Sequence, residues 1–211
     1  MGKSALVLGA TGVVGRELVR ELCESRGYDE VWAWARHKIG FCHPKLRAQV
    51  IDFEGISDIA PHKFYEIFCA LGTTMKQAGS REAFLRVDVD YVYAAAKWGK
   101  AAGVRRFVLV SSLGAKESSL SFYLRAKGRI ERRVSELGFD SLQIVRPPLI
   151  LGERSDARPI ERLATAVFKL LPACVLGKFR PLSGASIARA MINAARSDAR
   201  GVQIYEPREF L

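Results

Sequence analysis

The chain has 211 residues and a net charge of +11, with 49% hydrophobic and 26% charged residues. This length corresponds to about one domain, and the composition is that of a globular protein, which excludes a disordered chain. The longest apolar run, residues 144–151, is interrupted by an arginine and two prolines, so it does not reach the ~20 residues of a transmembrane helix. The apolar run near the N-terminus is too short for a secretory signal, so we expect a cytoplasmic protein.

The strands predicted from the sequence alternate with amphipathic helices along the first 145 residues. In chain order, the apolar pattern predicts a strand at 4–8, a helix at 13–25, strands at 31–35, 49–51 and 64–71, a helix at 81–102, a strand at 107–110, a helix at 118–137 and a strand at 142–145. This alternation is typical of parallel strands joined by helices. We therefore expect an α/β fold with a doubly wound, parallel, Rossmann-type sheet in a single domain over residues 1–211.

The alternation stops after Pro147 and Pro148. Helices are predicted at 161–171 and 185–196, and a closing strand at 201–205. A segment of this size does not easily build a core of its own. We interpret residues 148–200 as a small helical cap on the carboxyl edge of the sheet, on the substrate side.

Cysteine and charge patterns restrict the partners. The four cysteines are scattered, and none has the spacing of a zinc site, so we predict no metal: Cys23, Cys42, Cys69 and Cys174. Residues 101–150 and 151–200 each carry nine basic and four acidic side chains, or +5. A basic surface favours anionic partners. We favour a solvated surface over nucleic-acid binding, because no aromatic residues interleave with the basic ones.

Three glycines with the spacing G-x-x-G-x-x-G join the first strand to the first helix: Gly9, Gly12 and Gly15. In a dinucleotide-binding turn, such glycines permit the tight turn, the approach of a pyrophosphate and close packing of helix on strand. The free amides of the helix N-terminus then attract the phosphates. We assign the whole turn to the cofactor, including Thr11, Val13 and Val14. A glycine-rich turn without a ligand is the alternative, which the flanking strand and helix disfavour.

The end of the second strand indicates which dinucleotide binds. NAD-binding versions of this turn carry an acid about 20 residues on, to hold the ribose. Here Arg36 and Lys38 occupy that place. A guanidinium binds a 2′-phosphate through a bidentate fork, which favours NADP(H) over the alternative of plain surface charges. Asp52 and Phe53 follow the third strand, and we assign them to the adenine side, although Asp52 is equally explained as a solvated carboxylate.

Four residues that follow the predicted fifth strand suggest acid–base chemistry. The strand ends at Ser111 and Ser112, and Tyr123 and Lys127 follow at helical i, i+4 spacing. An ammonium beside a phenol stabilises the phenolate, so that the phenol can exchange a proton near neutral pH. Lys127 continues an apolar stripe of the helix that faces the sheet, where burial of its charge costs free energy. This position indicates a functional role, and the alternative is a side chain whose stem carries the ammonium to the edge of the sheet.

These motifs together resemble the extended and atypical short-chain dehydrogenases/reductases, and in particular the Tat-interactive-protein subgroup, over nearly the whole chain. The segments that carry the resemblance beyond the glycine turn are 69–74, 86–92, 111–115, 123–128 and 146–147. The resemblance implies an NADP-binding Rossmann fold and a catalytic triad of Ser112, Tyr123 and Lys127. It also implies cofactor contacts from Leu71, Gly72, Thr73, Ser111, Tyr123, Lys127, Arg146 and Pro147.

The chain departs from the family pattern in three ways. The interval from serine to tyrosine is short, so Ser111 is an alternative to Ser112 as the active hydroxyl. No asparagine is assigned as the fourth catalytic residue of ordinary members, and the short cap implies a shallow substrate pocket.

We therefore expect an NADPH-dependent reductase of a small carbonyl compound, or the reverse reaction on an alcohol. The alternative is a non-catalytic NADP(H)-binding regulator or redox sensor that acts through a protein partner, as the nitrogen-regulator-like relatives are thought to do. Those relatives lack the tyrosine, so the presence of Tyr123 and Lys127 favours the enzyme.

A third possibility, an anionic or nucleic-acid partner for the basic half, predicts salt-sensitive DNA binding. The arginines at 125, 129, 132 and 133 lie mainly off the Tyr123 face and are interpreted as solvated.

Overall fold

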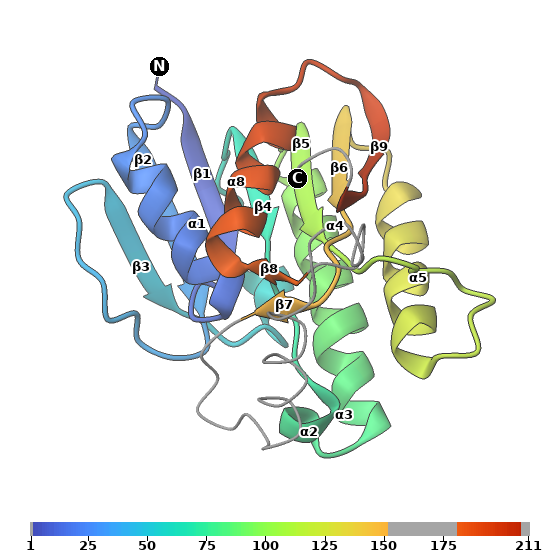
Figure 1. Cartoon of the computed structure of the whole chain (residues 1–211). Coiled ribbons are helices and arrows are strands. Elements are labelled where there is room, and N and C mark those ends of the chain that lie inside the picture. The colour runs from blue at the N-terminus through green and yellow to red at the C-terminus, as the bar shows by residue number, and fades with distance from the viewer. Residues whose placement is uncertain (1, 152–180, 208–211) are drawn as a thin grey trace.

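The computed structural model describes residues 2–151 and 181–207, which form a central sheet covered by helices on both faces (Figure 1). The strands of this sheet are all parallel and lie in the order β3-β2-β1-β4-β5-β6-β9. Their bounds are β1 (Ser4–Leu8), β2 (Glu30–Ala35), β3 (Leu46–Val50), β4 (Glu66–Cys69), β5 (Arg106–Val110), β6 (Ser141–Val145) and β9 (Gly201–Tyr205). The order reverses between β1 and β4, which is the point where doubly wound sheets bind ligands. The predicted fold class is confirmed.

Two predicted strands differ from the observed ones, because the residues that pair in the sheet are not the same as the apolar residues of the segment. The third strand was predicted at 49–51 but pairs with β2 from Leu46 onward, through largely exposed residues. It lies at one edge of the sheet, so pairing alone defines it and an apolar pattern does not reveal it. Conversely, the predicted strand at 64–71 pairs only as Glu66–Cys69, and Phe64 and Leu71 are buried in the core beyond its two ends.

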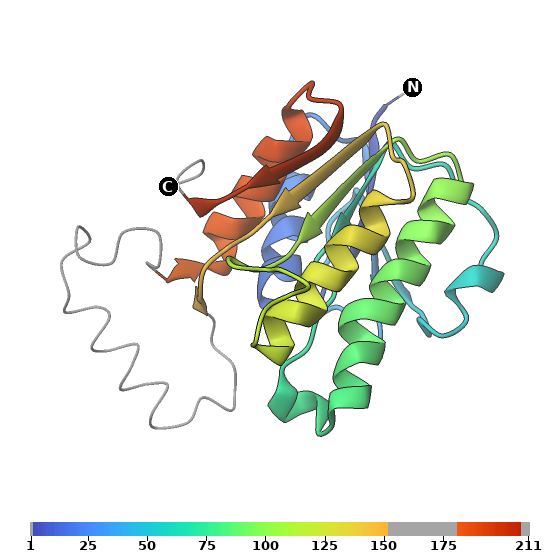
Figure 2. The same cartoon turned by 90° about the vertical axis from the view of Figure 1, so that its right-hand side faces the viewer.

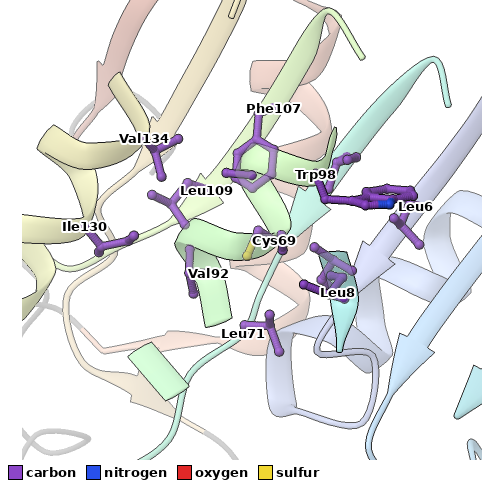
Figure 3. Packing of buried hydrophobic residues seen from close by; sticks show 14 of the residues in the cluster. Leu6, Leu8, Cys69, Leu71, Val92, Trp98, Phe107, Leu109, Ile130 and Val134 are labelled. Carbon is purple, nitrogen blue, oxygen red and sulfur yellow. The ribbon is translucent and has the colours of Figure 1, made fainter. Parts of the chain in front are cut away.

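Two helical layers enclose the sheet (Figure 2). Helices α1 (Val13–Glu24) and α8 (Gly184–Arg196) pack against one face, and α4 (Val92–Ala101) and α5 (Phe122–Ser135) against the other. On the second face, Ile130 and Val134 of α5 point at Leu109 of β5 (Figure 3). Burial of each such side chain contributes about 1.5–3 kcal/mol, and this apolar contact holds α5 over the end of β5.

The predicted helix at 81–102 is interrupted. It consists of α3 (Arg81–Leu85), a π-helical segment (Arg86–Tyr91) and α4. In the π-helical segment Asp88 and Val89 are buried, whereas Val87 and Tyr91 are half-buried. Short elements complete the described chain: η1 (Ile56–Asp58), α2 (Met75–Ala78), β7 (Ile150–Leu151) and β8 (Leu182–Ser183).

The helix predicted at 118–137 begins later, at Phe122. Ser121 N-caps it by accepting a hydrogen bond from the amide of Leu124. Residues 118–121 are not helical, so the helix starts one residue before Tyr123.

The C-terminal region is described in part. The predicted helix at 161–171 lies outside the described residues. The second predicted helix corresponds to α8, which packs on α1 as part of the layer that covers the sheet. The cap over 148–200 stays a prediction. Within 2–151 and 181–207, no helix is both long enough and apolar enough to cross a bilayer.

Candidate cofactor and active site

The turn between β1 and α1 is packed so tightly that it requires glycine. Gly9 has a φ of +79°, and a Cβ at this position would lie 2.6 Å from the carbonyl oxygen of Ala70. A Cβ on Gly15 would lie 2.1 Å from the carbonyl oxygen of Gly9. The predicted reason for these glycines, a tight turn with a helix pressed onto it, matches this geometry.

The N-terminus of α1 presents backbone amides to this turn. Gly12 is its N-cap and provides no side-chain acceptor, and the first turn of the helix contains no acid. Thr11 is exposed beside it, whereas the side chain of Val14 is buried, so Val14 can contribute only its backbone amide. Unpaired amides at a helix N-terminus favour anions, so these residues fit the phosphates of a dinucleotide.

Arg36 and Lys38 lie at the same edge of the sheet. Both are exposed and follow the end of β2, whose Trp34 carbonyl accepts a hydrogen bond of 3.2 Å from the amide of Gly9. Neither cation forms an ion pair with another described residue. No carboxylate follows β2 over residues 36–40. The two cations therefore present positive charge next to the glycine turn.

The residues assigned to the adenine side differ in what they can offer. Asp52 is exposed and accepts a 3.0 Å hydrogen bond from the amide of Glu54. Phe53 is buried and stacks on Tyr91 at 6.1 Å between ring centroids. Leu71, which the resemblance gives as a further cofactor contact, is buried as well. Only Asp52 has a side chain exposed for a ligand, and the other two form part of the core below.

A buried ion pair lies under the loop that follows β4. The Nζ of Lys127 is 2.8 Å from Oδ1 of Asp88, and the two side chains are 7% and 1% exposed. Oδ2 of Asp88 accepts a 2.7 Å hydrogen bond from the amide of Thr73. A Cβ on Gly72 would lie 3.3 Å from Oδ1 of Asp88. The loop expected beside the cofactor therefore rests on the carboxylate that holds Lys127, and this lysine does not extend to solvent.

Helix α5 places Tyr123 directly above Lys127. The Nζ of Lys127 is 5.9 Å from the centroid of the Tyr123 ring, and the tyrosine is 37% exposed. Burial alone would lower the pKa of Lys127, but Asp88 and the phenol of Tyr123 outweigh it and raise this pKa above its ordinary value. The geometry therefore places an accessible phenol next to a buried, charged ammonium.

The two serines after β5 have different surroundings. Ser111 is buried, and its hydroxyl donates to Oε1 of Glu131. Ser112 is half-buried, and among the described residues its hydroxyl meets only the carbonyl oxygen of Leu113, at 3.5 Å. Ser111 is therefore committed to a structural contact, whereas the hydroxyl of Ser112 is available.

Arg146 and Pro147 follow β6 at the same edge. Arg146 forms a two-pronged contact with Glu131, with Nη2 at 2.6 Å from Oε2 and Nε at 3.0 Å from Oε1. The carbonyl of Pro147 accepts a 2.8 Å hydrogen bond from the amide of Leu113. The guanidinium of Arg146 thus anchors α5, and Pro147 lies against the loop that follows β5, residues 111–121.

Asp88 and Glu131 are site residues to which the sequence reasoning assigned no role. Glu131 follows Lys127 by four positions and Tyr123 by eight, so an acid on the buried face of the predicted helix was the available signal. Asp88 lies in the segment 86–92 that carries part of the family resemblance, four positions after Phe84, so this i, i+4 interval was its available signal.

The arginine stripe of α5 lies mainly in solvent. Arg132 pairs with Glu117 and with Glu136, both at 2.8 Å, and Arg133 pairs with Asp90 at 3.4 Å. Surface acids therefore engage these two arginines, which fits the interpretation of a solvated face.

A half-open cavity of about 930 Å³ lies at the opposite, amino edge of the sheet. Its charged lining residues have both signs: Lys63, Arg105, Arg106, Arg200, Asp140 and Asp198. None of the candidate cofactor or catalytic residues lines it, so this cavity is not the candidate site.

Comparison with known proteins supports a nucleotide-binding chain. The model of the family described as NAD(P)H-binding matches residues 9–197. Protein HTATIP2 of Rattus norvegicus is 38% identical over 205 residues, which cover 94% of this chain and 84% of that protein. FMP52-1 of Scheffersomyces stipitis is 35% identical over 219 residues, which cover 98% and 96%. These relatives confirm the resemblance to the Tat-interactive-protein subgroup.

Solved structures confirm the fold at low sequence identity. MoeE5 in complex with UDP-glucose and NAD superimposes with a TM-score of 0.73 at 20% identity, and covers 95% of this chain and 74% of that one. The dTDP-4-dehydrorhamnose reductase of Bacillus anthracis in complex with NADP has a TM-score of 0.69 at 13% identity, with coverage of 98% and 75%. Both share the Rossmann architecture with this chain.

The expectation of a cytoplasmic protein requires correction. The FMP52 relatives of Scheffersomyces stipitis, Debaryomyces hansenii and Candida albicans are named mitochondrial. The sequence argument tested only for an apolar secretory core, whereas mitochondrial targeting uses amphipathic basic segments that such a test does not detect.

Proposed function

The chain belongs to the NAD(P)H-binding family, and from this membership we propose that it is an oxidoreductase that transfers hydride between NADP(H) and a small carbonyl or alcohol compound. The observation that carries the proposal is the exposed phenol of Tyr123 above the buried ammonium of Lys127, at the sheet edge that also presents the glycine turn. A regulator without catalysis does not require a buried lysine next to an exposed tyrosine.

The chemistry follows from the roles of three side chains. The bound cofactor supplies or accepts the hydride. In the reducing direction the hydroxyl of Tyr123 gives its proton to the carbonyl oxygen, and the ammonium of Lys127 stabilises the phenolate that remains. The hydroxyl of Ser112 donates a hydrogen bond to the same oxygen, and Ser111 keeps the loop in place through Glu131.

The preference for NADP(H) over NAD(H) is also proposed. It is supported by Arg36 and Lys38 after β2, where a carboxylate would repel a 2′-phosphate, and by the lack of any acid over residues 36–40. The amides at the N-terminus of α1 would hold the pyrophosphate, and the exposed Asp52 would face the adenine.

The experiment is a panel of small aldehydes, ketones and alcohols, followed by NADPH absorbance, with wild type and Tyr123→Phe. The substitution removes one hydroxyl and should leave folding and NADPH affinity nearly unchanged. Turnover should fall by roughly 10²–10⁴-fold, the usual contribution of general acid–base catalysis. Tyr65→Phe is the matched control, since Tyr65 is exposed at the opposite edge of the sheet and should keep full turnover.

Full turnover in Tyr123→Phe on any substrate found would reject the catalytic assignment. Tight NADPH binding without any substrate would instead favour a regulator that acts through a protein partner.

A further inference from the structure

We propose that Asp88 is a positioning residue of this site, whose carboxylate keeps the Lys127 ammonium in place beside Tyr123 and joins it to the loop that faces the cofactor. The inference rests on the proposed function, because it gives Asp88 a part in the same reaction.

Both oxygens of the Asp88 carboxylate have a close neighbour of opposite polarity. Oδ1 lies 2.8 Å from the Nζ of Lys127, and Oδ2 accepts the 2.7 Å hydrogen bond from the amide of Thr73. The backbone contact sets the orientation of the carboxylate, and the carboxylate in turn sets the direction of the ammonium. One side chain thus connects the loop after β4 with helix α5.

Two helices meet at this point through residues with matching spacing. Phe84 and Asp88 are four positions apart, as are Tyr123 and Lys127. The ring of Phe84 lies 5.9 Å from the ring of Tyr123, and Asp88 pairs with Lys127. Asp88 lies in the π-helical segment and is buried. Such π turns are rare and are often found at functional sites.

The groups around Lys127 leave Asp88 as its counter-charge. The thiol of Cys69, on β4, faces the lysine, but burial raises its pKa to about 12, so it is uncharged. Tyr123 faces it from α5, and Glu131, one turn further on, is held by Arg146. Among the described residues, Asp88 is the only carboxylate in contact with Lys127. Without it, a buried ammonium would lose its proton readily.

The test follows the proton of Lys127 directly and needs no substrate. The full chain is labelled with ¹³C at lysine Cε, and the Lys127 signal is assigned by its loss in Lys127→Met. In wild type this signal should stay in its protonated position across the accessible alkaline range. In Asp88→Asn it should titrate lower by about one pH unit or more, since burial shifts unpaired lysines by up to ~3–5 units.

Asp90→Asn is the matched control. It makes the same substitution two residues on in the same segment, at an exposed acid that pairs with Arg133. Its Lys127 signal should titrate as in wild type. An unchanged Lys127 titration in Asp88→Asn would overturn the proposal, whatever the substrate panel shows.

A second substitution keeps the proposal testable if the Asp88→Asn variant does not fold. Should Asp88→Asn fail to fold, Asp88→Asn combined with Lys127→Met leaves neither partner charged and should recover the folded state. A double variant no more stable than Asp88→Asn alone would overturn the proposal. Once a substrate is known, Asp88→Asn should lower kcat about as far as Lys127→Met, and the double variant should lower it no further.

Discussion

Single side chains decide the chemistry at the carboxyl edge of the sheet. Ser111 and Ser112 are adjacent and chemically identical, yet Glu131 binds one hydroxyl and leaves the other available. Lys127 is buried at a position where an unpaired charge would be costly, and Asp88 compensates that charge. The surroundings of each group, more than its residue type, determine its role.

Arg36 should determine the cofactor preference. Wild type should bind NADPH more tightly than NADH, because a hydrogen bond to a charged group contributes about 1.5–3 kcal/mol. Arg36→Asp removes that contact and adds repulsion, so the preference should fall by roughly 10-fold or more. Isothermal calorimetry with both cofactors measures it. Arg26→Asp, at an exposed position after α1, is the control and should retain the preference for NADPH. Equal affinities of wild type for NADPH and NADH would refute the assignment.

At the scale of elements, helix α5 is held in register by several segments. Asp88 holds it from the π-helical segment, and Arg146 holds it from the end of β6. The loop between β5 and α5, residues 111–121, packs against it at Gly128, where a Cβ would lie 2.4 Å from the carbonyl carbon of Lys116 and 2.5 Å from the amide of Glu117. This close approach keeps the loop and the helix at a fixed separation.

Gly128→Ala should destabilise the protein although alanine favours helices. Helix propensity alone would add about 1 kcal/mol of stability. The added Cβ meets backbone atoms that cannot move aside cheaply, and overpacking of this kind costs about 1–3 kcal/mol. We expect a lower free energy of unfolding in urea and a reduced turnover, because α5 carries Tyr123 and Lys127. Gly40→Ala has open space around its Cβ and should change stability by less than about 0.5 kcal/mol. A stabilised Gly128→Ala would contradict the packing argument.

At the scale of the whole molecule, a buried polar cluster ties the two halves of the chain at the amino edge of the sheet. The hydroxyl of Tyr28 donates to Glu66, and Arg106 lies 3.4 Å from the same carboxylate. Arg106 also donates to the carbonyls of Ala195 and Ser197 at the end of α8. The cluster therefore joins β4 and β5 to the last helix, away from the candidate site.

Glu66 should make stability depend on pH. Burial raises the pKa of this carboxyl above its usual value, against the opposing effects of Tyr28 and Arg106. The folded state then binds the proton more tightly than the unfolded state, so stability is lost as pH rises through the raised pKa. The unfolding free energy of wild type minus that of Glu66→Gln should therefore decrease from about pH 4.5 upward, in urea titrations at several pH values. Glu24→Gln, at an exposed position of α1, should show no such trend, and an increase with pH would refute the assignment.

The sequence by itself determined the architecture, the nucleotide turn and the Tyr123–Lys127 pair. These features are local: strand–helix alternation, glycine spacing and an i, i+4 interval each lie within one or two consecutive elements. They can be predicted from the sequence because the hydrophobic periodicity and the need for glycine in a tight turn depend on residues that are close together in the chain.

Tertiary structure alone decided which partners surround that pair. Asp88 meets Lys127, and Ser111 meets Glu131, across 39 and 20 residues of chain. The π-helical segment around Asp88 and the exposed pairing of β3 leave no trace in an apolar pattern. Contacts between distant segments depend on how the helices pack on the sheet, and periodicity reports only which residues of one element share a face.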